Sequence, residues 1–311
     1  MGSLWLGDED LAAYADTVPV EVYWLLGAEA AERLRRIAGT APLLGSTAFE
    51  RGGIFVMRRS GRHLLIDAGP HGQQGLGGHA HNDILHIEVW ADGVGWLVDG
   101  GVGVYAPDLR LRNRMRSTRA HNTLMIDNEE QWPFDPRRPF LLPASRWPRI
   151  LGWRSDSTAD WFDAESDAYS RLKSPVHHRR RVLFAKDLDG WVVADDLTGD
   201  GRHRVRWALH LGPGISATVS GPGRFQADHE SGACISIACR GFPDGQFRIV
   251  DDIVSFSYGT TEPSLTLEWE GILTCPIGLR VTILPSASDQ RFAEAERHTA
   301  LLEAWIREAS V

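Results

Sequence analysis

The sequence contains few cysteines, and their spacing is not that of a disulfide-rich or zinc-ribbon protein. Only three are present among 311 residues, at Cys234, Cys239 and Cys275. An odd number of thiols allows at most one bridge within the chain, which excludes a disulfide framework. We therefore predict that the three cysteines are thiols of the protein core.

Excess positive charge and long apolar runs are also lacking. Lysine and arginine together number 33, against 41 aspartates and glutamates, so the net charge is −8. This balance argues against a general nucleic-acid binder, which needs a basic surface. No stretch approaches ~18 uninterrupted apolar residues, so no membrane span is expected.

The N-terminal residues show no export signal. Residues 1–6 lead directly into the acidic residues 8–10, without a basic segment or a long apolar segment. We therefore expect no signal peptide at this end, and these residues leave the compartment of the protein open.

Turn-forming and aromatic residues, in contrast, are abundant. The chain has 32 glycines, 16 prolines and 12 tryptophans, which is typical of a β protein with many turns. Residues 1–40 instead repeat apolar positions every three or four residues, as a helix does. That stub is too short to form a core of its own. It either packs on the rest of the chain or ends a larger helical domain.

After Pro42 the apolar period changes from about 3.6 to 2, and short strands alternate with glycine- and aspartate-containing turns. We predict a mainly β fold, with a large antiparallel β-sandwich over residues 41–288. Residues 289–311 regain helical spacing and are predicted to form a C-terminal helical tail. A homo-oligomer is left open.

Polar and charged residues are concentrated between residues 69 and 132. His79 and His81 are two residues apart, so an extended strand would point both side chains to one face. Asp99 ends the return strand of the next hairpin and could lie beside His81, and His121 would complete the set. Two imidazoles and one carboxylate are ligands that suit zinc. Surface or capping histidines are the alternative.

Four arginines follow within seven residues, at Arg110, Arg112, Arg114 and Arg116. A solvated strand or loop would explain them. Their position beside the histidines instead favours an anionic ligand, because guanidinium groups bind carboxylate and sulfate in a planar, bidentate manner.

Three motifs in this region, in this order, resemble the signature of the heparinase II/III-like family of polysaccharide lyases. They read G-G-H-A-H-N-D-I-L, W-L-V-D-G-G-V-G-V-Y and R-S-T-R-A-H-N-T-L-M-I-D. A later pattern at 178–197 also resembles the β domain of that family. The resemblance covers roughly residues 42–285. It implies an antiparallel β-sandwich that follows an (α/α) toroid. Residues 1–40 resemble the last helices of that toroid, and most of the toroid is missing.

The resemblance also implies an activity and roles for particular residues. Members of the family cleave acidic, uronate-containing polysaccharides such as heparin, heparan sulfate and alginate by β-elimination, and they are often periplasmic or secreted. A base removes the proton next to the uronate carboxylate, and an acid protonates the departing oxygen. His79 matches the catalytic histidine of the β domain. The positions that match the ligands of a largely structural zinc are His81, Asp99 and His121, the last with the most variable spacing.

Other residues near these motifs have less specific expectations. Tyr105 could contact substrate or replace the missing acid, or it could be an aromatic plug at a strand end. Arg116 and Arg119 are candidate binders of the substrate carboxylate. Asn122 is a candidate substrate contact, or a turn residue that orients His121. Since the family's other catalytic groups lie in the toroid, we expect little or no lyase activity from this chain alone.

Two other functions remain open. A cupin-like metalloenzyme also uses an H-x-H strand, but Glu88 lies farther from His81 than the usual cupin spacing. A carbohydrate-binding β-sandwich without catalytic activity, or a truncated lyase, would explain the missing toroid directly. Iron with oxygen consumption would favour the former, and glycan binding without cleavage the latter.

Overall fold

The computed structural model describes residues 2–6, 17–37, 45–72, 77–144, 146–243, 245–285 and 300. The chain divides into two compact units, Met1–Gly45 and Ser46–Val311. The predicted C-terminal helical tail, residues 289–311, lies outside the described residues apart from Ala300. No described helix is long and apolar enough to cross a bilayer.

The first unit contains two helices, α1 (Gly2–Leu6) and α2 (Val20–Ile37). Gly27 has a φ of 85° and interrupts α2, so that its two halves are separate helical segments. The buried side chains of this unit are few and include Val22, Ala31 and Leu34. The predicted relation of residues 1–40 to the end of a helical toroid stays a prediction.

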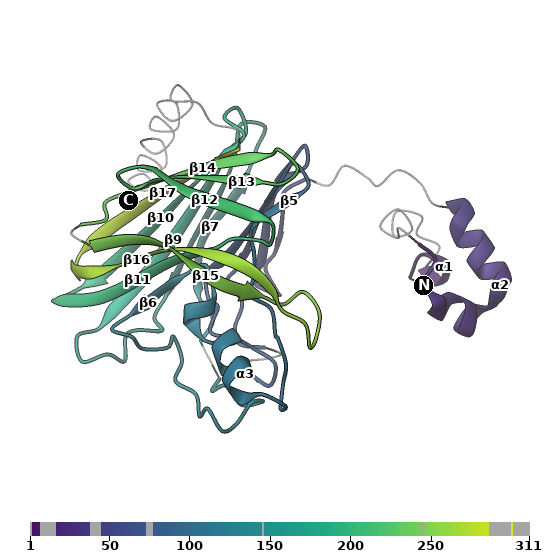
Figure 1. The fold of residues 1–311 in the computed structure, drawn as a ribbon, viewed down its shortest axis with the longest axis horizontal. Coiled ribbons are helices and arrows are strands. Elements are labelled where there is room, and N and C mark those ends of the chain that lie inside the picture. The colour runs from purple at the N-terminus through teal and green to yellow at the C-terminus, as the bar shows by residue number, and fades with distance from the viewer. Residues whose placement is uncertain are drawn as a thin grey trace. The chain divides into compact units, whose positions relative to one another are not determined.

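The second unit is built from three antiparallel sheets (Figure 1). The five-stranded sheet follows chain order, with β1 (Thr47–Phe49), β2 (Ile54–Arg59), β3 (Arg62–Asp67), β4 (His86–Ala91) and β5 (Val94–Leu97).

Tight turns join two of its hairpins. Ser60 and Gly61 have φ values of 47° and 79°, and Asp92 and Gly93 have 54° and 79°. Two consecutive positive φ angles match the right-handed twist of paired strands, which explains the choice of these residue types.

The eight-stranded sheet has the order β12-β13-β14-β17-β10-β9-β8-β7. Its strands are β7 (Arg149–Ser155), β8 (Ala159–Ser166), β9 (Val176–Ala185), β10 (Gly190–Gly199), β12 (Ile215–Gly221), β13 (Arg224–His229), β14 (Cys234–Arg240) and β17 (Ile277–Pro285).

The four-stranded sheet has the order β15-β16-β11-β6. It contains β6 (Leu124–Ile126), β11 (Arg202–His210), β15 (Gly245–Val254) and β16 (Glu262–Thr274).

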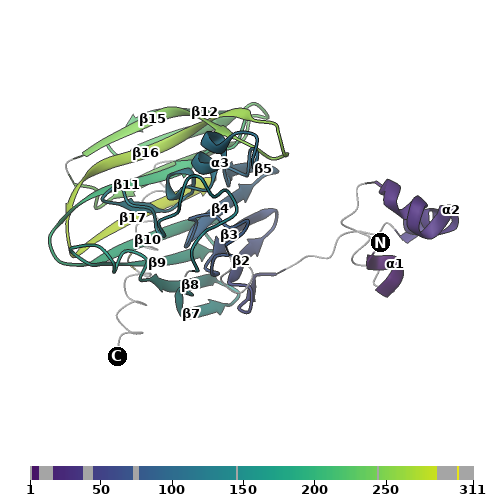
Figure 2. The same cartoon turned by 90° about the horizontal axis from the view of Figure 1, so that it is seen from below.

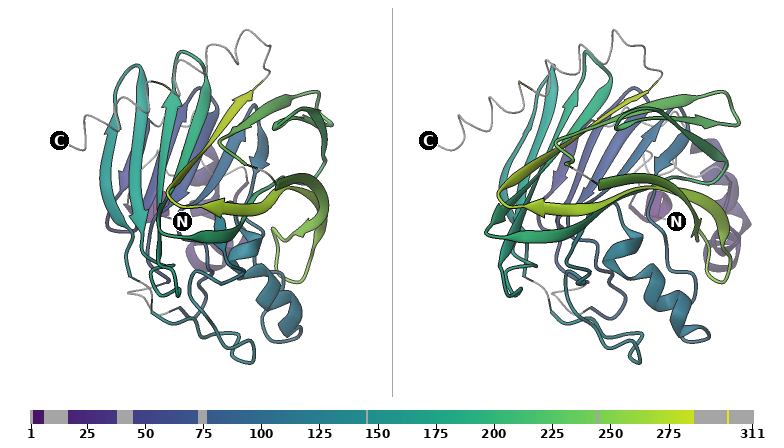
Figure 3. Two further views of the ribbon diagram at one scale, coloured as in Figure 1. Left: turned by 90° about the vertical axis from the view of Figure 1, so that its left-hand side faces the viewer. Right: turned by 60° about the vertical axis from the view of Figure 1, so that its left-hand side comes forward.

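One continuous apolar core joins the three sheets. Phe55 of β2 packs on Phe162 of β8, with 4.9 Å between ring centroids, and Phe225 of β13 packs on Phe247 of β15 at 5.3 Å. The eight-stranded sheet therefore contacts both smaller sheets, as two turned views show (Figures 2 and 3). The predicted antiparallel β-sandwich is confirmed, and Cys239 and Cys275 are buried in it as free thiols.

The connection between β5 and β6 contains most of the residues singled out in the sequence. It includes the helix α3 (Leu109–Met115) and the short 3-10 helix η2 (Thr118–Ala120), at one end of the sandwich (Figure 1). The side chain of Asp108 caps α3 by accepting hydrogen bonds from the backbone nitrogens of Arg110 and Leu111. Arg110, Arg112 and Arg114 thus lie on a helix, and Arg116 caps its C-terminal end.

Candidate functional site

Three loops bring the predicted metal ligands together. These loops are residues 77–85, the segment after β5, and the segment around η2. His81, Asp83, Asp99 and His121 each offer one ligand atom within 4.8 Å of the others. The predicted grouping of His81, Asp99 and His121 is thus present in the structure, and Asp83 joins it.

The expected strand at His79 and His81 is wrong. Residues 77–83 form an irregular loop, in which His79 is exposed and His81 is buried. This loop belongs to the connection between β3, which ends at Asp67, and β4, which begins at His86. As a result the two histidines face different surroundings: His81 joins the buried group and His79 remains at the surface.

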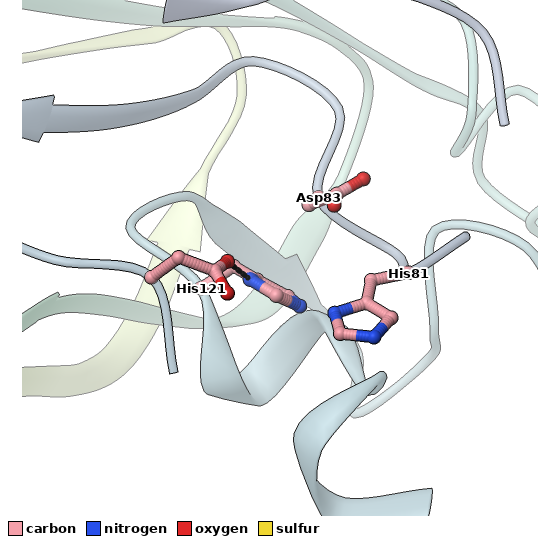
Figure 4. Close-up of side chains that lie close together, drawn as sticks. His81, Asp83 and His121 are labelled. Atoms are coloured by element: carbon pink, nitrogen blue, oxygen red, sulfur yellow. Dashed lines mark hydrogen bonds and ion pairs between the residues drawn. The ribbon is translucent and has the colours of Figure 1, made fainter. Parts of the chain in front are cut away.

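The orientation of His121 is fixed by Asp99. Nδ1 of His121 lies 2.8 Å from Oδ2 of Asp99, and the backbone nitrogen of Gly101 donates to the other carboxylate oxygen. Nε2 of His121 is buried and has no hydrogen-bond partner among the described residues. It points toward the ring of His81 (Figure 4).

Burial and neighbouring charges set the ionisation of this group. Burial lowers the pKa of His81 to about 3, so its ring is neutral at pH 7 and able to act as a ligand. Burial alone would raise the pKa of Asp99, but the charge and hydrogen bond of His121 lower it well below its usual value. Burial raises the pKa of Asp83, and it raises that of nearby Asp67 to about 7. The site therefore holds more carboxyl groups than its own cations balance.

These residues fit a divalent metal ion such as zinc. Imidazole nitrogens and carboxylate oxygens are its usual protein ligands. The unpartnered Nε2 of His121 would gain a ligand bond, and a cation would favour the charged forms of the buried carboxyl groups. A histidine whose other nitrogen is held by a carboxylate is typical of metal sites, so Asp99 is placed either to bind the ion or to orient His121.

One contact restricts the geometry of such a site. Nη1 of Arg112 lies 2.8 Å from Nε2 of His81, so that nitrogen accepts the guanidinium proton. A metal would have to bind Nδ1 of His81, or displace Arg112 from Nε2. The side chain of Arg112 is fully buried in this position.

The two predicted catalytic residues meet beside this group. The rings of His79 and Tyr105 pack edge to face, with 5.3 Å between their centroids. The guanidinium group of Arg112 lies 5.3 Å from the centre of the Tyr105 ring. Arg112 therefore connects the exposed His79 and Tyr105 pair to the buried His81.

Comparison with known proteins identifies the family of this chain. The family described as heparinase II/III-like, C-terminal, matches residues 41–293. The chain belongs to this family. A heparin-sulfate lyase from Pedobacter heparinus is 27% identical over 180 residues, which is 55% of this chain and 24% of that protein.

Solved structures show the same fold. A mutant of the heparan sulfate lyase HepC from Pedobacter heparinus has a TM-score of 0.69 and 19% identity, covering 90% of this chain and 42% of that one. A heparinase III has a TM-score of 0.67 and 21% identity, covering 82% of this chain and 39% of that one. The chain thus spans less than half the length of these relatives.

The arginines of this heparinase II/III-like domain divide into two groups. Arg112 and Arg116 are fully buried, and Arg116 donates to the carbonyl oxygens of Asp135 and Leu141. Arg114 and Arg119 instead line a cavity of about 730 Å³ between α3 and the four-stranded sheet. Arg119 lies 3.7 Å from Glu268 of the same cavity, and its role as a binder of the substrate carboxylate stays a prediction. The substrate role of Arg116 stays a prediction, and its contacts favour a bracing role.

Asn122 lies in the interior of the domain. Its side-chain nitrogen donates to the carbonyl oxygens of Ile87 and Val98, and its side-chain oxygen accepts from the backbone nitrogen of His210. Its own backbone nitrogen donates to Nδ1 of His86. These bonds use both polar atoms of the side chain. They favour the turn role over the predicted substrate contact, which stays a prediction.

A buried ion pair in the eight-stranded sheet supports the loops that contain His81 and His121. The guanidinium group of Arg180 contacts both carboxylate oxygens of Asp195, at 2.7 and 2.8 Å. Its remaining nitrogen, Nη1, donates to the carbonyl oxygens of Leu85 and Asn122, both at 2.6 Å. Arg180 therefore ties the eight-stranded sheet to the residues that follow Asp83 and His121.

Sequence reasoning missed Asp83 and Arg180. Asp83 lies two residues after His81, and the same spacing that drew attention to the histidines could have found it. Arg180 lies in a strand far along the chain, and the sequence carries no signal that it reaches Leu85 and Asn122. Glu88 is not part of the group that could hold a metal, so the structure gives the cupin-like alternative no support.

Proposed function

We propose that this chain is the β-sandwich part of a polysaccharide lyase that cleaves uronate-containing acidic polysaccharide by β-elimination. The observation that supports it most is the pairing of exposed His79 with Tyr105 beside a group suited to hold a metal, in a chain of this family. The names of the relatives point to heparin-like polymers, and exposed Arg119 would bind their acidic groups.

In this proposal His79 and Tyr105 serve the elimination. A base takes the proton next to the uronate carboxylate, and the electrons of that C–H bond form a carbon–carbon double bond. The glycosidic C–O bond breaks, and its oxygen receives a proton. His79 neutralises the carboxylate or carries the proton, since its imidazole is exposed at the loop surface. Tyr105 contacts the sugar or supplies the proton to the leaving oxygen.

Zinc has a structural part in this proposal. His81 and His121 would hold it, together with Asp83, Asp99 or both. When bound, the ion supplies a cross-link between three loops that carry few regular hydrogen bonds. His79, in the loop that contains two of these residues, would thereby be kept in a fixed position.

A domain exchange tests the proposal. Residues 41–293 would replace the corresponding part of the Pedobacter heparinus lyase, and release of unsaturated uronate would be followed by ultraviolet absorbance. We expect the chimera to cleave and its His79→Ala variant to lose at least about a hundredfold in rate. His177→Ala, on β9, is the matched control. A folded chimera whose rate is the same with and without His79 would contradict the proposal.

A carbohydrate-binding domain that does not cleave is the second candidate. The exposed aromatic rings around His79 favour it, because such rings bind sugars without any catalytic group. Binding of oligosaccharide by a chimera that never releases product would support this function over the first.

A further inference from the structure

We propose that Tyr105, Phe140 and Tyr258 form a stacking platform for one sugar ring beside His79. Tyr105 lies in the centre, with its ring centroid 5.5 Å from that of Phe140 and 5.4 Å from that of Tyr258. His79 lies 5.3 Å from Tyr105 and 5.7 Å from Phe140. The three rings of this aromatic platform come from three separate loops, and His79 comes from a fourth.

The platform faces solvent. Phe140 is 47% exposed and Tyr258 is 60% exposed, and Tyr105 is half-buried between them. Leaving contiguous aromatic surface in water is unfavourable, and an exposed apolar patch with a polar rim marks a binding site. These rings therefore form a surface suited to bind a ligand, and they are not packed in the core of the domain.

Hydrogen bonds hold the loop of Phe140 in place. The backbone nitrogen of Leu142 donates to the carbonyl oxygen of Gly77, two residues before His79. Buried Arg112 donates to the carbonyl oxygen of Pro139, and buried Arg116 donates to that of Leu141. Both residues flanking Phe140 are thus fixed by guanidinium groups, one from Arg112 of α3 and one from Arg116, which caps that helix.

The loop of Tyr258 is fixed in a similar way. The backbone nitrogen of Gly259 donates to the carbonyl oxygen of Gly103 at 2.8 Å, and that of Ser255 donates to Gly100 at 3.0 Å. A side chain at Gly101 would place its Cβ 2.0 Å from the carbonyl oxygen of Ser255, so the two loops pack backbone to backbone. The platform is thereby held ready before any ligand arrives, which reduces the entropic cost of binding.

A pyranose ring fits the chemistry of this surface. One face of such a ring presents C–H groups, which pack on aromatic rings, and its edge carries hydroxyl groups. The phenol hydroxyls of Tyr105 and Tyr258 and the imidazole of His79 supply hydrogen-bonding groups of the kind that edge needs. The inference rests on the proposed function, since the sugar would belong to the polysaccharide whose cleavage is assigned to His79.

Binding to the full chain tests the platform separately from cleavage. Hexasaccharides derived from heparan sulfate and from alginate would be titrated by calorimetry and by NMR of the aromatic protons. We expect Phe140→Ala and Tyr258→Ala each to weaken binding by about three- to tenfold, and Tyr258→Phe to keep most of it. Phe49→Ala, which removes an exposed ring on β1, is the matched control and should leave binding unchanged.

The outcomes separate the two proposals. Equal affinities of Phe140→Ala, Tyr258→Ala and Phe49→Ala, or no binding of either hexasaccharide, would overturn the platform whatever the chimera does. Weakened binding in the platform variants, together with a chimera whose cleavage rate is unchanged by His79→Ala, would support the platform and contradict the lyase function.

Discussion

His121 donates its Nδ1 proton to Asp99 across 2.8 Å, and this bond leaves the opposite nitrogen, Nε2, pointing toward His81. The ring of His86 packs against His121 on another side, with 5.4 Å between centroids. His121 is therefore held by its neighbours in one orientation, with one buried nitrogen left for a ligand.

The first prediction concerns metal content. We expect one zinc ion per chain, lost in His81→Ala and His121→Ala because each removes a ligand nitrogen. If Asp99 orients His121 without binding the ion, Asp99→Asn should weaken zinc binding by about 10- to 100-fold rather than abolish it. Elemental analysis and a competitive chelator titration measure both effects. Metal content that is zero in the parent and in every variant would exclude the site.

The second prediction concerns the buried ion pair of Arg180 and Asp195. Burial alone would raise the pKa of Asp195, but the charge of Arg180 and the hydrogen bond from His178 lower it well below its usual value. Arg180→Met should therefore lower the free energy of unfolding by about 3–5 kcal/mol, because it leaves a buried carboxylate without its cation. Urea denaturation measures this loss.

An exposed ion pair is the control for Arg180. Arg149 lies 3.2 Å from Glu165, and its side chain is 68% exposed. Arg149→Met should lower the free energy of unfolding by at most about 1 kcal/mol. Similar losses in the two variants would show that Arg180 does not brace the loops as described.

The third prediction is a pH dependence caused by His71. Burial lowers the pKa of this histidine to about 4, below the value of 6.5 expected in the unfolded chain. The folded state therefore disfavours its protonation, and the stability it contributes above pH 6.5 is lost as pH falls through 4. The parent should lose about 3 kcal/mol relative to His71→Gln between pH 7 and pH 4.

Urea denaturation of the parent and His71→Gln at several pH values measures that difference. The comparison cancels the opposing contribution of Asp67, because that residue is present in both proteins. Burial raises the pKa of Asp67 to about 7, so its ionisation lowers the stability of the folded protein as pH rises. A difference between the two proteins that stays constant from pH 7 to pH 4 would contradict the assigned burial of His71.

The fold was largely predictable, because alternating apolar residues and pairs such as Ser60-Gly61 report strands and turns directly. The helix α3 was not predicted. Its two buried residues are Arg112 and Met115, and the next residue, Arg116, caps the helix and is also buried. A pattern based on apolar residues does not find a helix of seven residues in which one of the two buried side chains is charged.

The candidate site was predictable in part. Residue types and spacing indicated His81, Asp99 and His121, and the structure brings them together. Their surroundings could not be derived from the sequence. Whether His79 shares the pocket of His81 depends on where β3 ends and β4 begins, and the buried positions of Arg116 and Asn122 depend on contacts between loops far apart in the chain.

The proposed function depends on one arrangement, in which His81 and His121 bind a metal and His79 does not. A crystal structure of the zinc-loaded chain, with anomalous data at the zinc edge, tests it most directly. We expect one peak about 2.0–2.1 Å from a nitrogen of His81 and from Nε2 of His121, with no bond to His79. Zinc bound to His79, or no peak between His81 and His121, would contradict it.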